Sequence, residues 1–210
     1  MTHRQPPEVL ETKKGGGESG FSLVEFLLST MILLLVATAV FAMLAETQRA
    51  SSYQTEVHAV MDNSRIALET VERIIRQAGN NPQGAALTPI TIVSASEVVI
   101  QSDLTGSAAS DKGDPDGTID DSGEDLRIRH NAGTRQIEVI PAGGSATAVA
   151  SYISAFSIEW FDAAGATTMD GAAARKARIR LTATTSIPNP QTRQVFGMQQ
   201  ASDVQVLNRL

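Results

Sequence analysis

One long apolar run lies near the N-terminus of the chain. Residues 21–44 contain a single charged residue, Glu25. A helix of 24 residues extends about 36 Å, enough to cross a hydrocarbon core of about 30 Å with some tilt. Lys13 and Lys14 precede the run, and positive charge tends to stay on the cytoplasmic side of a membrane. The pattern predicts a membrane-spanning helix with its N-terminus in the cytoplasm.

A helical period continues beyond this run. Apolar residues recur at steps of three and four, and charged residues fill most of the other positions. Gly79, followed by two asparagines and Pro82, is a typical helix stop. We therefore expect a nearly continuous helix over about 21–78, looser near Ser51 and Ser52, whose second half packs on a sheet. The predicted apolar stripe consists of Val57, Val60, Met61, Ala67, Leu68, Val71, Ile74, Ile75 and Ala78.

After Pro82 the pattern changes to short runs rich in valine, isoleucine and threonine. Apolar and polar residues alternate in 126–129 and 178–181, which indicates strands with one wet face. Residues 131–134 predict a hairpin turn. The expected fold is α+β: a long N-terminal helix, with a membrane half and an amphipathic half, packed on an antiparallel β-sheet. The predicted strands are 89–94, 97–102, 126–131, 136–141, 153–162, 178–185 and 202–207.

Charge and composition narrow the possible functions. The net charge is −6 and aromatic residues make up 4%, so neither a basic stripe nor a stacking platform for nucleic acid is expected. With no cysteine, disulfides, a thiol nucleophile and zinc–thiolate sites are excluded. His3, His58 and His130 are scattered, without spaced partners for a metal or a catalytic triad. We do not expect an enzyme.

The acidity is concentrated in one segment. Residues 110–125 contain seven carboxylates and one lysine, which accounts for the whole net charge. Calcium prefers oxygen ligands on glycine-containing loops, and the candidate ligands are Asp114, Asp116, Asp120 and Asp121. The pattern is not that of an EF-hand, because Lys112 occupies the first ligand position and Glu124 comes one residue too late. Three interpretations remain: an irregular calcium loop, a solvated acidic loop, and a docking patch for a basic partner.

The N-terminus differs from an ordinary secretory signal, in which small residues follow a shorter apolar core. Here Gly20 precedes the apolar run and Glu25 lies inside it. Together with the two lysines and Phe21, these residues resemble the processing site of type IV prepilins and type II secretion pseudopilins. The resemblance implies that a prepilin peptidase cuts between Gly20 and Phe21, that Phe21 is then N-methylated, and that Glu25 becomes the fifth mature residue.

A second segment extends the resemblance. Residues 63–82, NSRIALETVERIIRQAGNNP, are similar to the stretch after the membrane helix in PilW-like minor pilins. The resemblance implies a leader (1–20), a transmembrane and filament-core helix (21–44), an amphipathic continuation (45–79) and a β-rich head domain (80–210). It implies a minor type IV pilin that primes assembly or sits at the tip. The protein would span the inner membrane once, with a periplasmic head, and later reach the pilus at the cell surface.

The implied partners are the prepilin peptidase, other major and minor pilins, and the inner-membrane assembly platform. A buried carboxylate and a buried ammonium are each costly alone but offset each other as a pair. The new amine at Phe21 of one subunit could therefore meet Glu25 of a neighbour. One alternative is a minor pseudopilin of a type II secretion system. Another is a signal-anchored periplasmic domain that binds calcium or another ligand and needs no cut after Gly20.

Overall fold

The computed structural model describes residues 20–106 and 112–208, which form one helix and eight strands. The predicted leader, apart from Gly20, lies outside these residues, as do Ser110 and Asp111 of the acidic segment. The chain divides into two compact units, Met1–Glu46 and Thr47–Leu210. The helix α1 (Leu23–Gln77) contributes residues to both.

In the N-terminal unit, the described residues form an apolar helix with exposed side chains. An 18-residue window of α1 has a mean hydropathy of 2.5 and is 0% buried. Phe26, Leu34 and Phe41 are 62%, 67% and 69% exposed. A row of large apolar side chains in contact with water is unfavourable, and lipid or other apolar helices would cover it. This confirms the predicted apolar helix, which suits a membrane anchor or a signal sequence.

In the second unit, α1 buries one face. Its buried residues follow one another mostly at steps of three and four, which confirms the predicted amphipathic helix. Met61 is an exception to the predicted stripe, because 40% of it is exposed. Ser51 and Ser52 are helical, so the expected looseness there is absent. The buried residues are Glu56, Val60, Ser64, Ala67, Val71, Ile74 and Ile75.

The helix ends where the sequence predicts. Gly79 has a φ of 73°, a left-handed conformation that glycine adopts without steric penalty at a helix C-terminus. Its N–H donates to the carbonyl of Gln101 at 2.9 Å. A Cβ at this position would lie 3.2 Å from Pro89 Cβ. Gly79 therefore both ends α1 and allows the chain to pass close to the first sheet.

Eight antiparallel strands form two sheets, not one. The first five are neighbours in chain order, and the last three form a second sheet in the order β6-β7-β8. The first sheet contains β1 (Ile90–Ser94), β2 (Glu97–Gln101), β3 (Asp125–Asn131), β4 (Gln136–Pro141) and β5 (Thr147–Ala150). The second contains β6 (Ile153–Phe161), β7 (Lys176–Thr184) and β8 (Gly197–Gln205).

Two strands differ from the prediction. The strand β5 was not predicted, because its four residues, TAVA, are too small and too few for a clear alternation. The last strand was predicted to begin at Ser202, whereas β8 begins at Gly197. The additional residues include Gln199 and Gln200 and show no apolar alternation. They are strand because each pairs with β7, as Gln200 does with Leu181.

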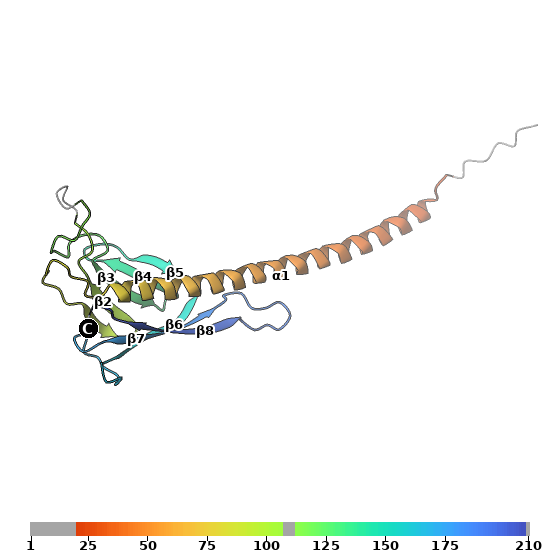
Figure 1. Ribbon diagram of the computed structural model, residues 1–210. Helices are drawn as coiled ribbons and strands as arrows, with labels where there is room; N and C mark the ends of the chain where they lie inside the picture. The colour runs from red at the N-terminus through yellow and green to blue at the C-terminus, as the bar shows by residue number, and fades with distance from the viewer. Residues whose placement is uncertain (1–19, 107–111, 209–210) are drawn as a thin grey trace, which may run out of the picture. The chain divides into compact units, whose positions relative to one another are not determined.

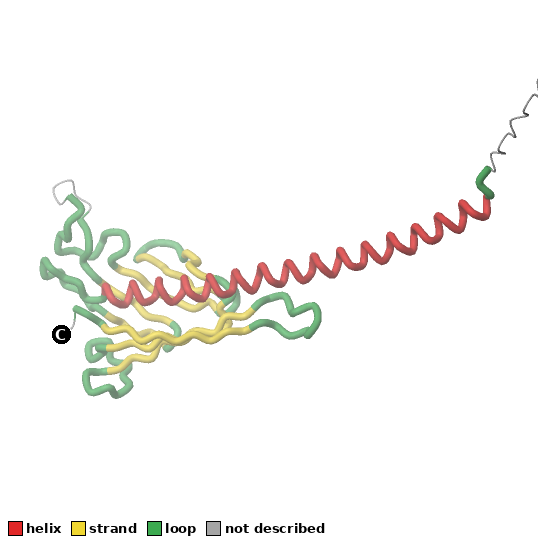
Figure 2. Tube along the Cα trace, turned by 45° about the vertical axis from the view of Figure 1, so that its right-hand side comes forward, coloured by secondary structure: helices red, strands yellow, loops and turns green. Residues whose placement is uncertain are grey.

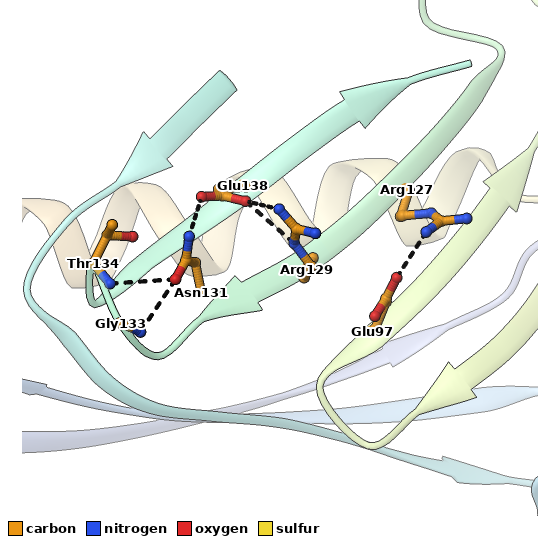
Figure 3. A network of polar contacts seen from close by, with 7 residues as sticks. All are labelled: Glu97, Arg127, Arg129, Asn131, Gly133, Thr134 and Glu138. Carbon is orange, nitrogen blue, oxygen red and sulfur yellow. Dashed lines mark hydrogen bonds and ion pairs between the residues drawn. The ribbon is translucent and has the colours of Figure 1, made fainter. Parts of the chain in front are cut away.

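The β3–β4 hairpin carries a polar network on its wet face (Figure 3). Asn131 Oδ1 accepts the N–H groups of Gly133 and Thr134 at 3.1 and 3.3 Å, and this side chain shapes the predicted turn. The left-handed residue of the turn is Arg135, with a φ of 57°. On the strands, Glu138 accepts two hydrogen bonds from Arg129 and one from Asn131 (Figure 3).

The core lies between the second half of α1 and both sheets. This half of the helix runs along the sheets (Figures 1 and 2). Polar contacts also join the helix to the strands and their connections. The backbone N–H of Ser151, in the β5–β6 connection, donates to Asn63 Oδ1 at 2.9 Å. Ser64 Oγ lies 3.4 Å from Met198 Sδ on β8. Trp160 is 1% exposed and is the largest fully buried side chain among the described residues.

Candidate functional site

The predicted cleavage site lies just ahead of the first turn of α1. Gly20 and Phe21 are not helical, and the helix starts with a hydrogen bond of 3.0 Å from Phe26 N–H to the Ser22 carbonyl. Phe21 is 76% exposed. No described atom beyond the chain neighbours lies within 4 Å of a Cβ added at Gly20. The peptide bond between Gly20 and Phe21 is therefore accessible.

Glu25 occupies the first turn of α1. A carboxylate at this position interacts favourably with the partial positive charge of a helix N-terminus. Its side chain is exposed, and its apolar neighbours Val24 and Phe26 are 71% and 62% exposed. In a bilayer or in an apolar helical assembly, this turn would place a carboxylate in an apolar environment. Gly20, Phe21 and Glu25 thus lie within two turns of one another at the start of the helix.

The acidic segment brings three of the four candidate calcium ligands together. Asp116, Asp120 and Asp121 can each place a carboxylate oxygen within 4.8 Å of the other two, and Asp114 does not join them. The Thr118 hydroxyl is in hydrogen-bond contact with both Asp116 and Asp120. The backbone N–H and then the hydroxyl of Thr118 lower the pKa of Asp116. Calcium takes six to eight oxygen ligands, so these three carboxylates would supply only some of them. Calcium binding stays a prediction.

Glu124 has a structural role at the base of this loop. It is 0% exposed, and its carboxylate accepts backbone N–H groups from Leu104, Thr105 and Asp121 at 2.7, 2.9 and 3.1 Å. Asp103, also 0% exposed, accepts the N–H of Gly117 at 3.1 Å. The hydrogen bonds of these two buried carboxylates fix the backbone of the acidic loop. Glu124 is therefore occupied by the backbone, in addition to lying outside the EF-hand pattern.

A third buried carboxylate, Glu56, was not predicted from the sequence to have a role. It lies on the buried face of α1, 8% exposed, and accepts the N–H groups of Ser186 and Ile187 at 2.8 and 2.9 Å. It fastens the loop between β7 and β8 to the helix. Glu56 lies four residues before Val60, which places it on the buried face of the helix, where a charged residue interrupts the apolar pattern.

No protein-family model, curated protein or solved structure matches the chain. The architecture itself is pilin-like. A long N-terminal helix has an apolar first part, and its second part packs against antiparallel sheets. The roles of Gly20, Phe21 and Glu25 are therefore inferred from their chemistry and from the resemblance to prepilins.

Proposed function

We propose that the chain is a prepilin that becomes a minor subunit of a type IV pilus, similar to PilW-like minor pilins. The observation that carries this proposal is an accessible bond between Gly20 and Phe21, directly before an apolar helix with Glu25 in its first turn. Prepilin peptidase would cut this bond, and Phe21 would become the methylated N-terminus. The subunit would then act in priming the filament or at its tip.

Glu25 gives the proposal a physical basis. An anchor alone needs no carboxylate in its apolar segment, and an unpaired one is unfavourable there. After cleavage, the ammonium group of Phe21 on a neighbouring subunit can pair with it, and each charge offsets the desolvation of the other. The apolar helix would hold the precursor in the membrane and later pack among the helices of other pilins. The head domain, residues 80–210, would make the lateral contacts.

Mass spectrometry of the protein from its native membrane tests the proposal. We expect a mature chain that starts at methylated Phe21. The variant Gly20→Val should retain its leader, because the family's peptidase cuts after glycine, whereas the control Gly16→Val should be cut as in the wild type. A wild-type chain that still carries residues 1–20, in cells with an active prepilin peptidase, would contradict the proposal.

Different observations distinguish the two alternative functions from the proposed one. A minor pseudopilin of a type II secretion system would show the same cleavage, but it would co-purify with secretion machinery instead of pili. A signal-anchored periplasmic domain would show no cut after Gly20, and its acidic loop would be the main clue to a calcium or ligand function.

A further inference from the structure

A hollow of about 670 Å³ lies at one end of the second sheet. It is formed where β6 ends, β7 begins and β8 ends, together with the loop between β6 and β7. All of these residues belong to the second unit. The side chains that matter for its charge and shape are Phe161, Asp162, Arg175, Lys176, Arg178 and Gln205.

Two cations that line the hollow, Lys176 and Arg178, are held in fixed positions. Arg178 donates two hydrogen bonds to Asp203, at 2.7 and 3.1 Å. Lys176 Nζ lies 2.7 Å from the same carboxylate. Both cations also lie over the ring of Phe161, 5.4 and 5.8 Å from its centroid, where the negative face of the ring attracts them. The single carboxylate of Asp203 therefore forms ion pairs with two cations whose positions are fixed.

The third cation, Arg175, increases the positive charge. Its Nη1 donates to the carbonyls of Ala172 and Ala174 at 3.0 and 3.1 Å. Within residues 20–106 and 112–208, no carboxylate forms an ion pair with it. Asp162 is engaged by the N–H groups of Ala164 and Ala166, both at 2.9 Å. Three cations thus face two carboxylates, so the hollow is electropositive in a chain of net charge −6.

The complementary surface is present in the same chain. Asp114, Asp116 and Asp120 are exposed in the acidic loop, whose single lysine is Lys112. In Figure 1 this loop, next to the grey segment 107–111, and the loop between β6 and β7 lie at opposite edges of the second unit. The acidic loop of one chain therefore does not reach the hollow of the same chain. A second copy can bring its own loop there.

We propose that this hollow binds the acidic loop of a second copy of the chain. The two surfaces are different patches, so the contact is head-to-tail and can repeat from copy to copy. Of the three interpretations of the acidic loop, this proposal favours a docking patch for a basic partner. The contact depends on charge complementarity and should weaken as salt screens it. It requires neither cleavage nor a filament, so it goes beyond the proposed function and does not depend on it.

Photo-crosslinking in membranes, with two differently tagged copies of the full chain, tests the contact. A photoreactive amino acid replaces Ala163, an exposed residue at the rim of the hollow. We expect crosslinks between the two tags that map to residues 112–125. Arg175→Gln should reduce their yield by about twofold to fivefold, the effect of losing a partly exposed ion pair. The control Arg180→Gln changes a cation on β7 that pairs with Glu159. Neither of these two residues lines the hollow, so the control should have no effect.

A charge exchange sharpens the test. Arg175→Glu in the crosslinker-bearing copy should abolish the crosslink, and Asp120→Lys in the other copy should restore it. Fluorescence of Trp160 checks that each variant is folded. Crosslinks only to other proteins, crosslinks that map elsewhere, or a yield unaffected by Arg175→Gln would overturn the proposal. The N-terminal mass of the crosslinked chains is measured in the same samples, so a failure of cleavage at Phe21 is distinguishable from a failure of the contact.

Discussion

At the scale of single residues, three buried carboxylates bind backbone N–H groups instead of cations. Glu56 accepts two such groups, Glu124 accepts three, and Asp103 accepts one. A buried carboxylate is tolerated only when hydrogen bonds replace the water it loses. Each of these side chains thereby fixes a loop: Glu56 the loop between β7 and β8, and the other two the acidic loop.

Replacing Glu56 with alanine should destabilise the second unit. The substitution leaves the N–H groups of Ser186 and Ile187 without their acceptors. A hydrogen bond to a charged group is worth about 1.5–3 kcal/mol, so the two together contribute about 3–6 kcal/mol. Urea unfolding of the full chain in detergent, followed by fluorescence of Trp160, measures the change. Trp160 is the single tryptophan and is 1% exposed, so it reports on this unit alone.

Glu69→Ala is the matched control for Glu56→Ala. Glu69 lies on the same helix but pairs on the surface with Arg65, one turn earlier. Exposed pairs of this kind contribute little, so the control should unfold close to the wild type. Equal destabilisation by both substitutions would mean that the loss of a helix carboxylate, and not the hydrogen bonds to the loop, is what matters.

At the scale of the elements, the β3–β4 hairpin carries a pH-sensitive contact. Glu138 is 7% exposed, and hydrogen bonds from Arg129 and then Asn131 lower its pKa from the ordinary value of 4.5. A pKa that is lower in the folded than in the unfolded state adds stability above the unfolded value, and this stability is lost as the pH falls below it. The hairpin should therefore weaken below about pH 4.5.

The variant Glu138→Gln tests this pH dependence. It removes the titrating group, so its free energy of unfolding should fall less steeply than that of the wild type between pH 5 and pH 3. Urea unfolding followed by Trp160 fluorescence at a series of pH values gives both curves. Glu69→Gln removes an exposed helix carboxylate as a control. If the curves of the wild type and Glu138→Gln ran parallel below pH 4.5, Glu138 would not be the group responsible.

The elements also show what the sequence could and could not predict. The helix and five of its seven buried positions followed from an apolar period, because burial of one face leaves that pattern. The strand alternation at Arg127 and Arg129 is likewise visible as a wet face. β8 was only partly predicted because pairing with β7, not its own side chains, makes it a strand. The hollow could not be predicted, because it joins residues from three strands that only the register brings together.

At the scale of the whole molecule, the two units are built for different surroundings. The described part of the first unit presents apolar side chains without a packed core of its own. The second unit has a core shared by α1 and both sheets, and carries the acidic loop and the electropositive hollow on its surface. The first therefore needs lipid or other helices, and the second is suited to contacts in water.

Glu25→Ala tests whether the apolar run, residues 21–44, uses its one carboxylate for assembly. We expect the leader to be removed as in the wild type, because Gly20 and Phe21 are unchanged. Incorporation into filaments should fall by about tenfold or more, because the ammonium group of a neighbour's Phe21 would be buried without a partner. Immunoblotting of purified filaments against the membrane fraction measures both steps. Ser29→Ala is the control, since it removes only a hydroxyl bonded to the Glu25 carbonyl at 2.8 Å. Wild-type incorporation of Glu25→Ala would contradict pairing between subunits and leave Glu25 with its local role in the first turn of α1.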